Sequence, residues 1–89
     1  MKAIVTVIGE DRVGIIASVC TLLAQNKVNV LDISQTILQG NFTMTMLVDV
    51  AACPLAFTEL AAKLEQVGAE LNVSVRIQRE AIFNAMYRV

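Results

Sequence analysis

The sequence predicts a single α+β domain whose elements follow the order strand, helix, strand, strand, helix, strand. Three observations predict this order. Four segments are rich in β-branched residues or alternate with a period of two, two segments between them carry apolar residues at helical spacing, and glycine or proline stands near several boundaries. A chain of 89 residues buries only about 60–65% of the surface that its unfolded form exposes, so it holds one hydrophobic core.

The first part of the chain predicts a strand followed by a helix. Residues 2–8 carry apolar side chains on both faces, which is typical of a central strand. From Val13 the apolar period becomes helical, with the helix ending near Asn26 and with Asp11 as its expected N-cap. The apolar stripe of this helix comprises Ile15, Ile16, Val19, Leu22 and Leu23.

A β-hairpin is expected next. Residues 28–38 and residues 42–50 each alternate with a period of two. The pair Gly40-Asn41 stands between them and favours a turn. The second run has an apolar face and a mostly polar face, as a strand with one buried side does.

The last part of the chain predicts a helix and a fourth strand. Pro54 is expected to open the helix and Gly68 to close it. The apolar stripe of this helix comprises Phe57, Leu60, Ala61, Leu64 and Val67. Residues 71–78 alternate as a strand, and residues 79–89 form a tail whose apolar stripe fits a short third helix.

This order of elements is the ferredoxin-like βαββαβ sandwich, in which right-handed crossovers place both helices on one face of a four-stranded antiparallel sheet. The polar residues of the last three strands are expected on the uncovered face. The second strand lies at a sheet edge, and residues 31–38 carry no lysine, proline or bulge beyond Asp32 to block pairing. We therefore expect a homodimer in which the edge strands 30–38 of two copies pair.

Composition and charge exclude several classes of function. Lysine and arginine together number 7 and aspartate and glutamate 8, without a run of like charge, so no nucleic-acid partner is expected. The most apolar charge-free stretch, residues 13–26, is too short to span a membrane. The N-terminus lacks the longer apolar region and the cleavage site of a signal peptide, so none is expected. We expect a cytoplasmic protein without a membrane partner. Apolar residues make up 56% of the chain, a surplus that an oligomer would bury.

Metal and imidazole chemistry are not expected either. The chain has no histidine, and its two cysteines, Cys20 and Cys53, do not form a CxxC pair. This excludes most zinc sites and every catalytic design that needs imidazole, and no cofactor is expected. Cys20 is expected as a small core residue on the first helix and Cys53 as a loop or cap residue.

The stretch VIGEDRVGII joins the first strand to the first helix, where many proteins hold an anion. Gly9 and Gly14 have the spacing of the outer glycines of a Walker A loop, but Ile15 and Ile16 stand where that loop needs Lys and then Ser or Thr. A nucleotide is therefore not expected. Arg12 could serve an acylphosphatase-like hydrolase, although the glycine-rich loop of that family is missing. RNA binding is not expected either, because the aromatic platform of an RNA recognition motif is absent.

A small zwitterion fits this loop better. The start of the helix, at residues 12–15, offers free N–H groups and a positive dipole end to a carboxylate. Asp11 beside it could take an ammonium group, and Gly14 lets the backbone approach a ligand closely. One carboxylate and one ammonium group held close together describe an amino acid.

At this point the sequence resembles the ACT domain, a ferredoxin-like module that binds amino acids and other small effectors, through GEDRVGI and, after the helix, KVNVLDISQ. The resemblance covers residues 2–78, and the tail REAIFNAMYRV is similar to that of a family of small stand-alone ACT proteins. It implies an effector site at a side-by-side dimer interface, between the first loop of one subunit and the start of the second strand of the other. Gly9, Asp11 and Gly14 match the loop positions, and Asn29 matches the residue from the other subunit. Some serine-binding members place histidine at the position of Gly9 and asparagine at that of Asp11, so the resemblance does not extend to serine as the ligand.

We therefore expect residues 1–89 to form one ACT-like domain, with residues 2–78 as its core and residues 79–89 as its tail. It is expected to sense an amino acid and to modulate a metabolic enzyme or regulator in trans, without catalytic residues of its own. The expected ligand-binding residues are Gly9, Asp11, Arg12, Val13, Gly14, Ile15 and Asn29.

Two alternatives stay open. The chain could be a purely structural or protein-interaction dimerisation module without a ligand, or an acylphosphatase-like small hydrolase. Within the expected site, Asp11 could equally be only a helix cap, and Asn29 could only satisfy turn backbone groups.

Overall fold

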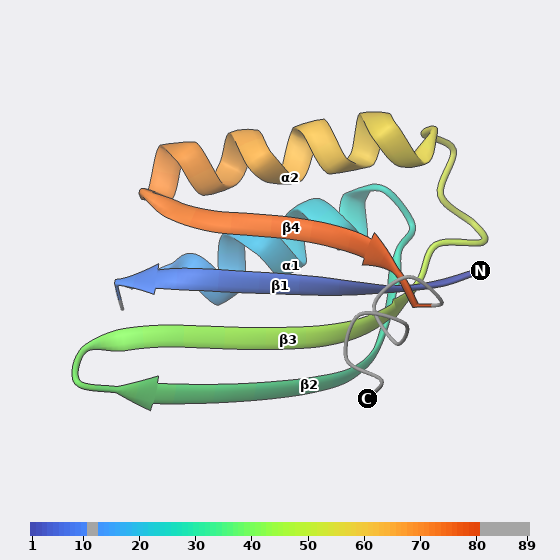
Figure 1. The fold of residues 1–89 in the computed structure, drawn as a ribbon. Coiled ribbons are helices and arrows are strands. Elements are labelled where there is room, and N and C mark those ends of the chain that lie inside the picture. The colour runs from blue at the N-terminus through green and yellow to red at the C-terminus, as the bar shows by residue number, and fades with distance from the viewer. Residues whose placement is uncertain (11–12, 81–89) are drawn as a thin grey trace.

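A computed structural model of the chain describes residues 1–10 and 13–80, apart from the side chain of Leu38, and confirms the predicted α+β class and element order (Figure 1). The predicted tail helix lies outside the described residues. The elements are β1 (Lys2–Glu10), α1 (Ile15–Gln25), β2 (Asn29–Leu38), β3 (Asn41–Asp49), α2 (Phe57–Leu71) and β4 (Val73–Arg79).

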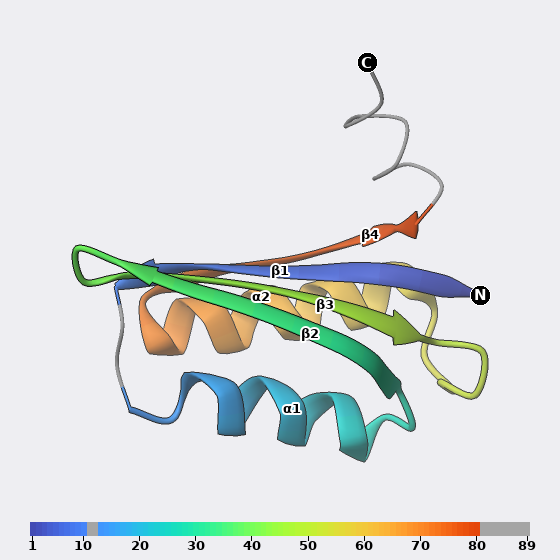
Figure 2. The ribbon, with the colours of Figure 1, turned by 90° about the horizontal axis from the view of Figure 1, so that it is seen from below.

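The strands form one antiparallel sheet in the order β2-β3-β1-β4, and both helices cover the same face of it (Figure 2). This is the predicted ferredoxin-like topology. It makes β1 and β3 the central strands and confirms that β2 lies at an edge. The other edge strand is β4, and α2 runs alongside it (Figure 1).

The core lies between the helices and one face of the sheet, and the two-residue period of the strands decides which side chains reach it. Val5 pairs with Met46 on one side and with Ile77 on the other, and all three are buried. The stripes of both helices meet this face as predicted, except that Ile16 is 39% exposed. Their buried members are Ile15, Val19, Leu23, Leu60 and Leu64.

The opposite face of the sheet carries polar side chains, as the alternation predicted. One register row runs across all four strands through Ser34, Thr45, Thr6 and Arg76. None of the described buried residues is polar or charged. Gln35 and Arg79 lie on the helix side, since they pair with the buried Met44 and Ala3, but both are on edge strands and are exposed.

The turn between β2 and β3 lies one residue earlier than predicted. Its two residues are Gln39 and Gly40, with φ of 53° and 79°, and Asn41 already begins β3. Two successive positive φ values are what a type I′ hairpin turn requires, and its twist matches that of the flanking strands. Glutamine rarely takes this conformation, which is why the sequence favoured the asparagine.

Both predicted ends of the second helix are wrong. Pro54 lies three residues before α2, whose N-cap is Ala56, and the Glu59 side chain accepts a hydrogen bond from the Ala56 N–H (3.4 Å). Gly68 does not close α2 but lies buried within it. The helix ends instead at Asn72, which takes the left-handed conformation with φ of 59°, so Leu71 belongs to α2 and not to β4.

The position of Gly68 has a packing reason. A Cβ atom at this residue would lie 2.7 Å from the carbonyl oxygen of Val73 and 2.9 Å from Cγ2 of Val75. The glycine therefore lets α2 approach the start of β4 more closely than any other residue would.

The cysteines lie as predicted. Cys20 on α1 and Cys53 in the loop before α2 are both half-buried against the core, and neither is in a disulfide. Within residues 1–10 and 13–80, neither helix has the length and apolar character needed to cross a membrane.

Candidate functional site

The first predicted site segment lies where β1 ends and α1 begins. Asp11 and Arg12 are outside the described residues. Val13 and Gly14 are exposed, whereas the side chain of Ile15 is only 2% exposed because it packs in the core. Of the predicted set, Ile15 can therefore meet a ligand only through its backbone.

The start of α1 differs from the prediction that Asp11 is its N-cap. The N-cap is Gly14, in the left-handed region with φ of 92°, and no side chain makes a capping hydrogen bond. The Ser18 N–H donates to the Gly14 carbonyl (2.9 Å), so the N–H groups of Ile15, Ile16 and Ala17 precede the first intrahelical bond. They point out of the positive end of the helix, where a carboxylate is stabilised.

Gly9 is part of β1 and not of the loop that follows it. It pairs with Phe42 of β3 and with Val73 of β4. A Cβ atom at Gly9 would lie 2.5 Å from Cγ1 and 2.8 Å from Cβ of Val73. Glycine is therefore needed here for the close approach of β4, independently of any ligand.

Asn29 lies at the other end of the domain. It is the exposed first residue of β2, and its Cα partner is Asp49, whereas Gly9 pairs with Phe42 at the opposite end of β3 (Figure 1). Gly9, Val13 and Gly14 thus lie near one end of the sheet, and the same chain cannot bring Asn29 to them.

The prediction that residues 31–38 of the edge strand β2 carry no bulge is wrong. The register with β3 shifts between Val30 and Asp32, so Leu31 forms a bulge. After the bulge the strand is regular, and Ile33 and Ile37 point to the helix side. They are 45% and 57% exposed because they lie at the outer limit of the sheet.

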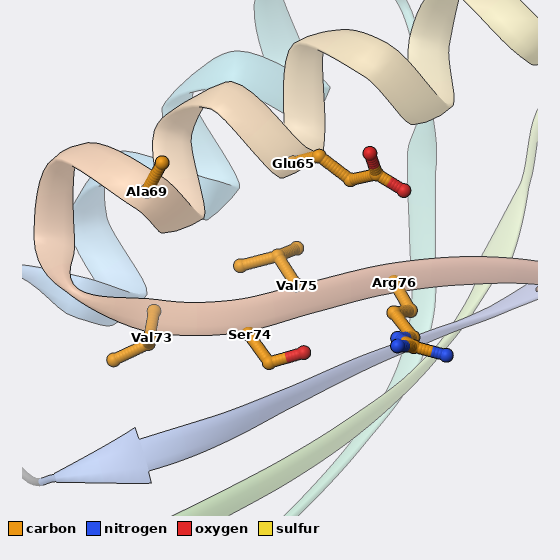
Figure 3. Close-up of a pocket in the computed structure, with 6 residues that line it drawn as sticks. All are labelled: Glu65, Ala69, Val73, Ser74, Val75 and Arg76. Atoms are coloured by element: carbon orange, nitrogen blue, oxygen red, sulfur yellow. The ribbon is translucent and has the colours of Figure 1, made fainter.

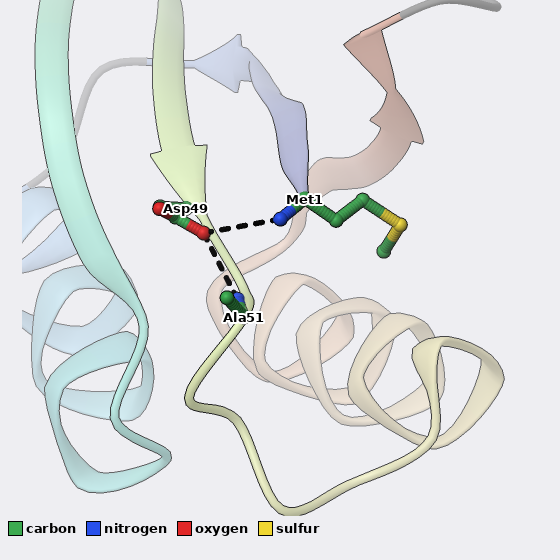
Figure 4. Close-up of polar contacts among 3 residues, drawn as sticks. All are labelled: Met1, Asp49 and Ala51. Atoms are coloured by element: carbon green, nitrogen blue, oxygen red, sulfur yellow. Dashed lines mark hydrogen bonds and ion pairs between the residues drawn. The ribbon is translucent and has the colours of Figure 1, made fainter.

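Sequence reasoning also missed a small electrostatic cluster beside Asn29. The carboxylate of Asp49 accepts a hydrogen bond from the Ala51 N–H (2.9 Å) and lies 3.4 Å from the Met1 ammonium group (Figure 4). The hydrogen bond from Ala51, together with the charge of Met1, holds the pKa of Asp49 below its ordinary value. The alternation of β3 placed Asp49 on the polar face, but only the register shows its neighbours.

Asp49→Asn is expected to remove stability in a pH-dependent way. The lowered pKa means that the charged form is favoured in the folded state, so the contribution is complete above the ordinary aspartate pKa of about 3.9 and is lost as the pH falls through the folded pKa. Asparagine keeps an oxygen for the Ala51 N–H but has no charge. Urea midpoints of the parent and the variant should differ by a constant amount above about pH 5 and should converge below about pH 4. A difference that stays constant down to pH 2 would show that Asp49 stabilises the fold without its charge.

The hollows found on the surface lie away from the predicted residues. One lies between α2 and β4, a second between the two helices near Ser18 and Val67, and a small third one near Met1 and Cys53. Within the described residues, no three acidic or cysteine side chains come together as metal ligands.

Comparisons with known proteins bear on the whole domain. The sequence model of the ACT domain matches residues 2–78, which confirms the resemblance seen in the two motifs. A UPF0237 protein of Clostridium acetobutylicum is 54% identical over 89 residues, which are 100% of both chains. The solved structure of an ACT domain protein from Streptococcus pneumoniae is 46% identical, with a TM-score of 0.82, and the match covers 98% of each chain.

A more distant solved structure is a regulatory one. The ligand-free regulatory subunit of aspartate kinase from Thermus thermophilus is 26% identical, with a TM-score of 0.67. The match covers 86% of this chain and 50% of that chain.

Proposed function

The chain belongs to the ACT domain family, and from this premise we propose that it is a cytoplasmic regulatory domain that binds an amino acid between two copies of itself. ACT domains are typically regulatory modules that bind small-molecule effectors, and they commonly dimerise. The finer statements, namely the amino acid, its site and regulation in trans without catalysis, are our proposal.

One observation carries the proposal: the two halves of the expected site lie at opposite ends of the edge strand β2. Asn29 begins β2, and β2 ends at Leu38, which pairs with Asn41 as Glu10 also does. Pairing of two β2 edges about a two-fold axis is antiparallel. It would bring Asn29 of the partner subunit to the end of the sheet where β1 stops and α1 begins.

The exposed apolar side chains of β2 support a dimer through this edge. Leu31, Ile33 and Ile37 are each more than two-fifths exposed, at 44%, 45% and 57%. The bulge at Leu31 and the charge of Asp32, which are features of a protected edge, stand near the start of β2, and residues 33–38 carry no charge. A second β2 would pair the free backbone groups and cover these side chains.

The chemistry of the ligand follows from the groups that meet in such a dimer. The uncapped N–H groups at the start of α1 favour a carboxylate, and Gly14 leaves room for it because nothing lies within 4 Å of a Cβ atom built there. Asp11 is the proposed acceptor for the ammonium group, and the amide of Asn29 the proposed contact from across the interface.

Such a ligand would control the formation of the dimer. A molecule that two subunits hold together binds the dimer better than the monomer, and it stabilises the dimer by that difference in affinity. The partner in trans, a metabolic enzyme or a regulator, would then respond to the surface that the liganded dimer presents.

A thermal-shift screen against the twenty amino acids tests the proposal. A ligand at about 100 times its dissociation constant stabilises the folded state by about 2.7 kcal/mol, which raises the Tm of a domain of this size by several degrees. Asn29→Ala and Asp11→Ala are expected to abolish the shift. Gln66→Ala changes another exposed carboxamide, on α2 beside β4 at the sheet edge opposite β2, and should keep it.

Two outcomes would reject the amino-acid site. Either no amino acid raises the Tm, or both Asn29→Ala and Asp11→Ala respond as the parent does. With no ligand response and a dimer intact, the chain would be a dimerisation module. Hydrolysis of acetyl phosphate that disappears in Arg12→Ala would instead support the hydrolase.

A further inference from the structure

The face of the sheet turned away from α1 and α2, which we call the open face, is polar over most of its area. Side chains alternate between the two faces, so on β4 Val75 points toward α2 whereas Ser74 and Arg76 point to the open face (Figure 3). The row that contains Arg76 continues through Thr6 and Thr45. An apolar group on the open face therefore lies in polar surroundings.

Two apolar side chains lie together near one end of the open face. Ile4 of β1 pairs with Leu47 of β3, and their neighbours along each strand reach the core, so both point to the open face. Leu47 is half-buried, and Ile4 is only 8% exposed. Ile8, further along β1 on the same face, is 52% exposed and lies between Thr43 and Ser74. Ile4 and Leu47 thus form an apolar pair, whereas Ile8 stands alone.

The chain leaves the sheet beside this pair. β4 ends at Arg79, which pairs with Ala3, the residue before Ile4 (Figure 1). The guanidinium of Arg79 lies over the ring of Phe57 at 5.4 Å, so these two side chains occupy the helix side of this end. Glu80, the last described residue, is helical and no longer extended. A helix that continues from Glu80 therefore begins on the strand next to Ile4.

The segment that follows has the composition and the length to cover the pair. Residues 81–89 carry four large apolar side chains that share one side of a helix, with Asn84 and Arg88 on the other side. The four are Ile82, Phe83, Met86 and Tyr87. A helix of nine residues is about 13.5 Å long. From the end of β4, Leu47 lies two strands or about 10 Å away, whereas Ile8 lies about 17 Å along β1, out of reach.

We propose that residues 81–89 fold back over the open face and bury their apolar side against Ile4 and Leu47 of the same chain. Four large apolar side chains within nine residues would otherwise form a patch that soluble proteins rarely leave uncovered. The pair is the apolar surface of the open face that this segment can reach. The chain then closes with its own residues the face that the helices leave open, and this face is not available to another protein.

Two other positions suit the segment less well. The small hollow near Met1, Cys53 and Phe57 has a volume of about 50 Å³, too little for an aromatic ring. Docking on a second copy would require the β4 ends of two chains to lie near each other. The proposed dimer joins the β2 edges instead, at the opposite side of the sheet.

The chain supplies its own reporter for the test, because Tyr87 is its only tyrosine and it has no tryptophan. Quenching of Tyr87 fluorescence by acrylamide measures the exposure of this side chain to solvent. In the full-length protein, the quenching constant is expected to be at least about threefold below that of N-acetyltyrosinamide, because a docked aromatic ring is shielded.

Variants on both sides of the contact locate the docking surface. Leu47→Ser and Phe83→Ser each remove an apolar side chain from it, and each is expected to raise the quenching constant at least about twofold. Phe83→Ser leaves residues 1–80 unchanged, so it remains informative if Leu47→Ser impairs folding. Ile8→Ser is the matched control, since it removes an apolar side chain from the same face beyond the reach of the segment, and it should leave the constant unchanged.

Three results would overturn the inference. The first is a parent quenching constant equal to that of N-acetyltyrosinamide, and the second is an unchanged constant in both Leu47→Ser and Phe83→Ser. The third comes from Leu47→Ser refolded together with an excess of Tyr87→Phe, which has an intact face and no tyrosine. The constant should stay raised in this mixture, and its return to the parent value would assign the contact to a second copy.

The inference is independent of the proposed function, because neither the pairing of β2 nor the start of α1 enters it. Phe83→Ser should therefore keep the thermal response of the parent to amino acids while its Tyr87 becomes exposed. A parent chain with a shielded Tyr87 and no response to any amino acid would reject the proposed function alone.

Discussion

A protein carrying Ile33→Lys and Ile37→Lys is expected to be monomeric at concentrations at which the parent chain is a dimer. Both side chains lie on the helix side of the edge strand β2 and are about half exposed in the single chain. A paired β2 would cover them, and burial of an isoleucine contributes about 1.5–3 kcal/mol. The double change also places several ammonium groups along one seam, where like charges directly opposite are destabilising.

The size of the effect follows from these two terms. Since about 1.4 kcal/mol corresponds to a factor of ten, the dissociation constant should rise at least about 100-fold. Sedimentation equilibrium over a dilution series measures it. The fold of each subunit should survive, because exposed substitutions outside the core usually change the free energy of unfolding by about 0.5 kcal/mol or less.

A matched control distinguishes the effect of changing the β2 edge from the effect of adding two positive charges. Thr21→Lys with Gln25→Lys adds the same two charges to an exposed face of α1 and should leave the dimer intact. If the edge variant stays dimeric, another surface holds the dimer. If the parent is a monomer at tens of micromolar, the assignment of β2 as the interface is wrong.

Strand and helix identity could be predicted from the sequence because the hydrophobic period is local. Ala3, Val5 and Val7 alternate toward the core, and the stripe from Ile15 to Leu23 recurs at helical spacing. These patterns are independent of which strand lies beside which. The topology then followed from the connection rules, and the structure confirms it.

The ends of elements could not be predicted because tertiary contacts decide them. Gly68 looks like a helix C-cap in the sequence, but a glycine is needed there because Val73 approaches the helix closely. Asn72 takes the left-handed conformation that ends the helix. The bulge at Leu31 likewise leaves no signal in the two-residue period. The predicted cap at Asp11 failed since α1 begins at Ile15, directly after Gly14.

The candidate site, like the fold, could be predicted only in part from the sequence. That Asn29 and the first loop must come from different chains was implied by the family resemblance, and their places at opposite ends of the sheet are consistent with it. The role of Gly9 could not be read from the loop, because the atoms that demand a glycine belong to Val73, far along the chain. A glycine that serves a ligand in a loop and a glycine that serves packing have the same appearance in a sequence.

Gly9→Ala is therefore expected to destabilise the fold by about 1–3 kcal/mol, the usual cost of forcing an extra carbon into a packed site. The new Cβ atom would lie 2.5 Å from Cγ1 and 2.8 Å from Cβ of Val73, so β4 has to move. Urea denaturation at one fixed protein concentration measures the change, because the stability of an oligomer depends on concentration.

A double-mutant cycle with Val73→Gly identifies the cause. Val73→Gly removes both close atoms, so Gly9→Ala should cost at least about 1 kcal/mol less in that background than in the parent. Gly40→Ala is the control, since Gly40 has a positive φ of 79° and open space around a Cβ atom. It should cost about 1–2 kcal/mol through its backbone alone and show no coupling to Val73. If Gly9 serves only a ligand, Gly9→Ala will unfold at the urea concentration of the parent while its thermal response to amino acids disappears.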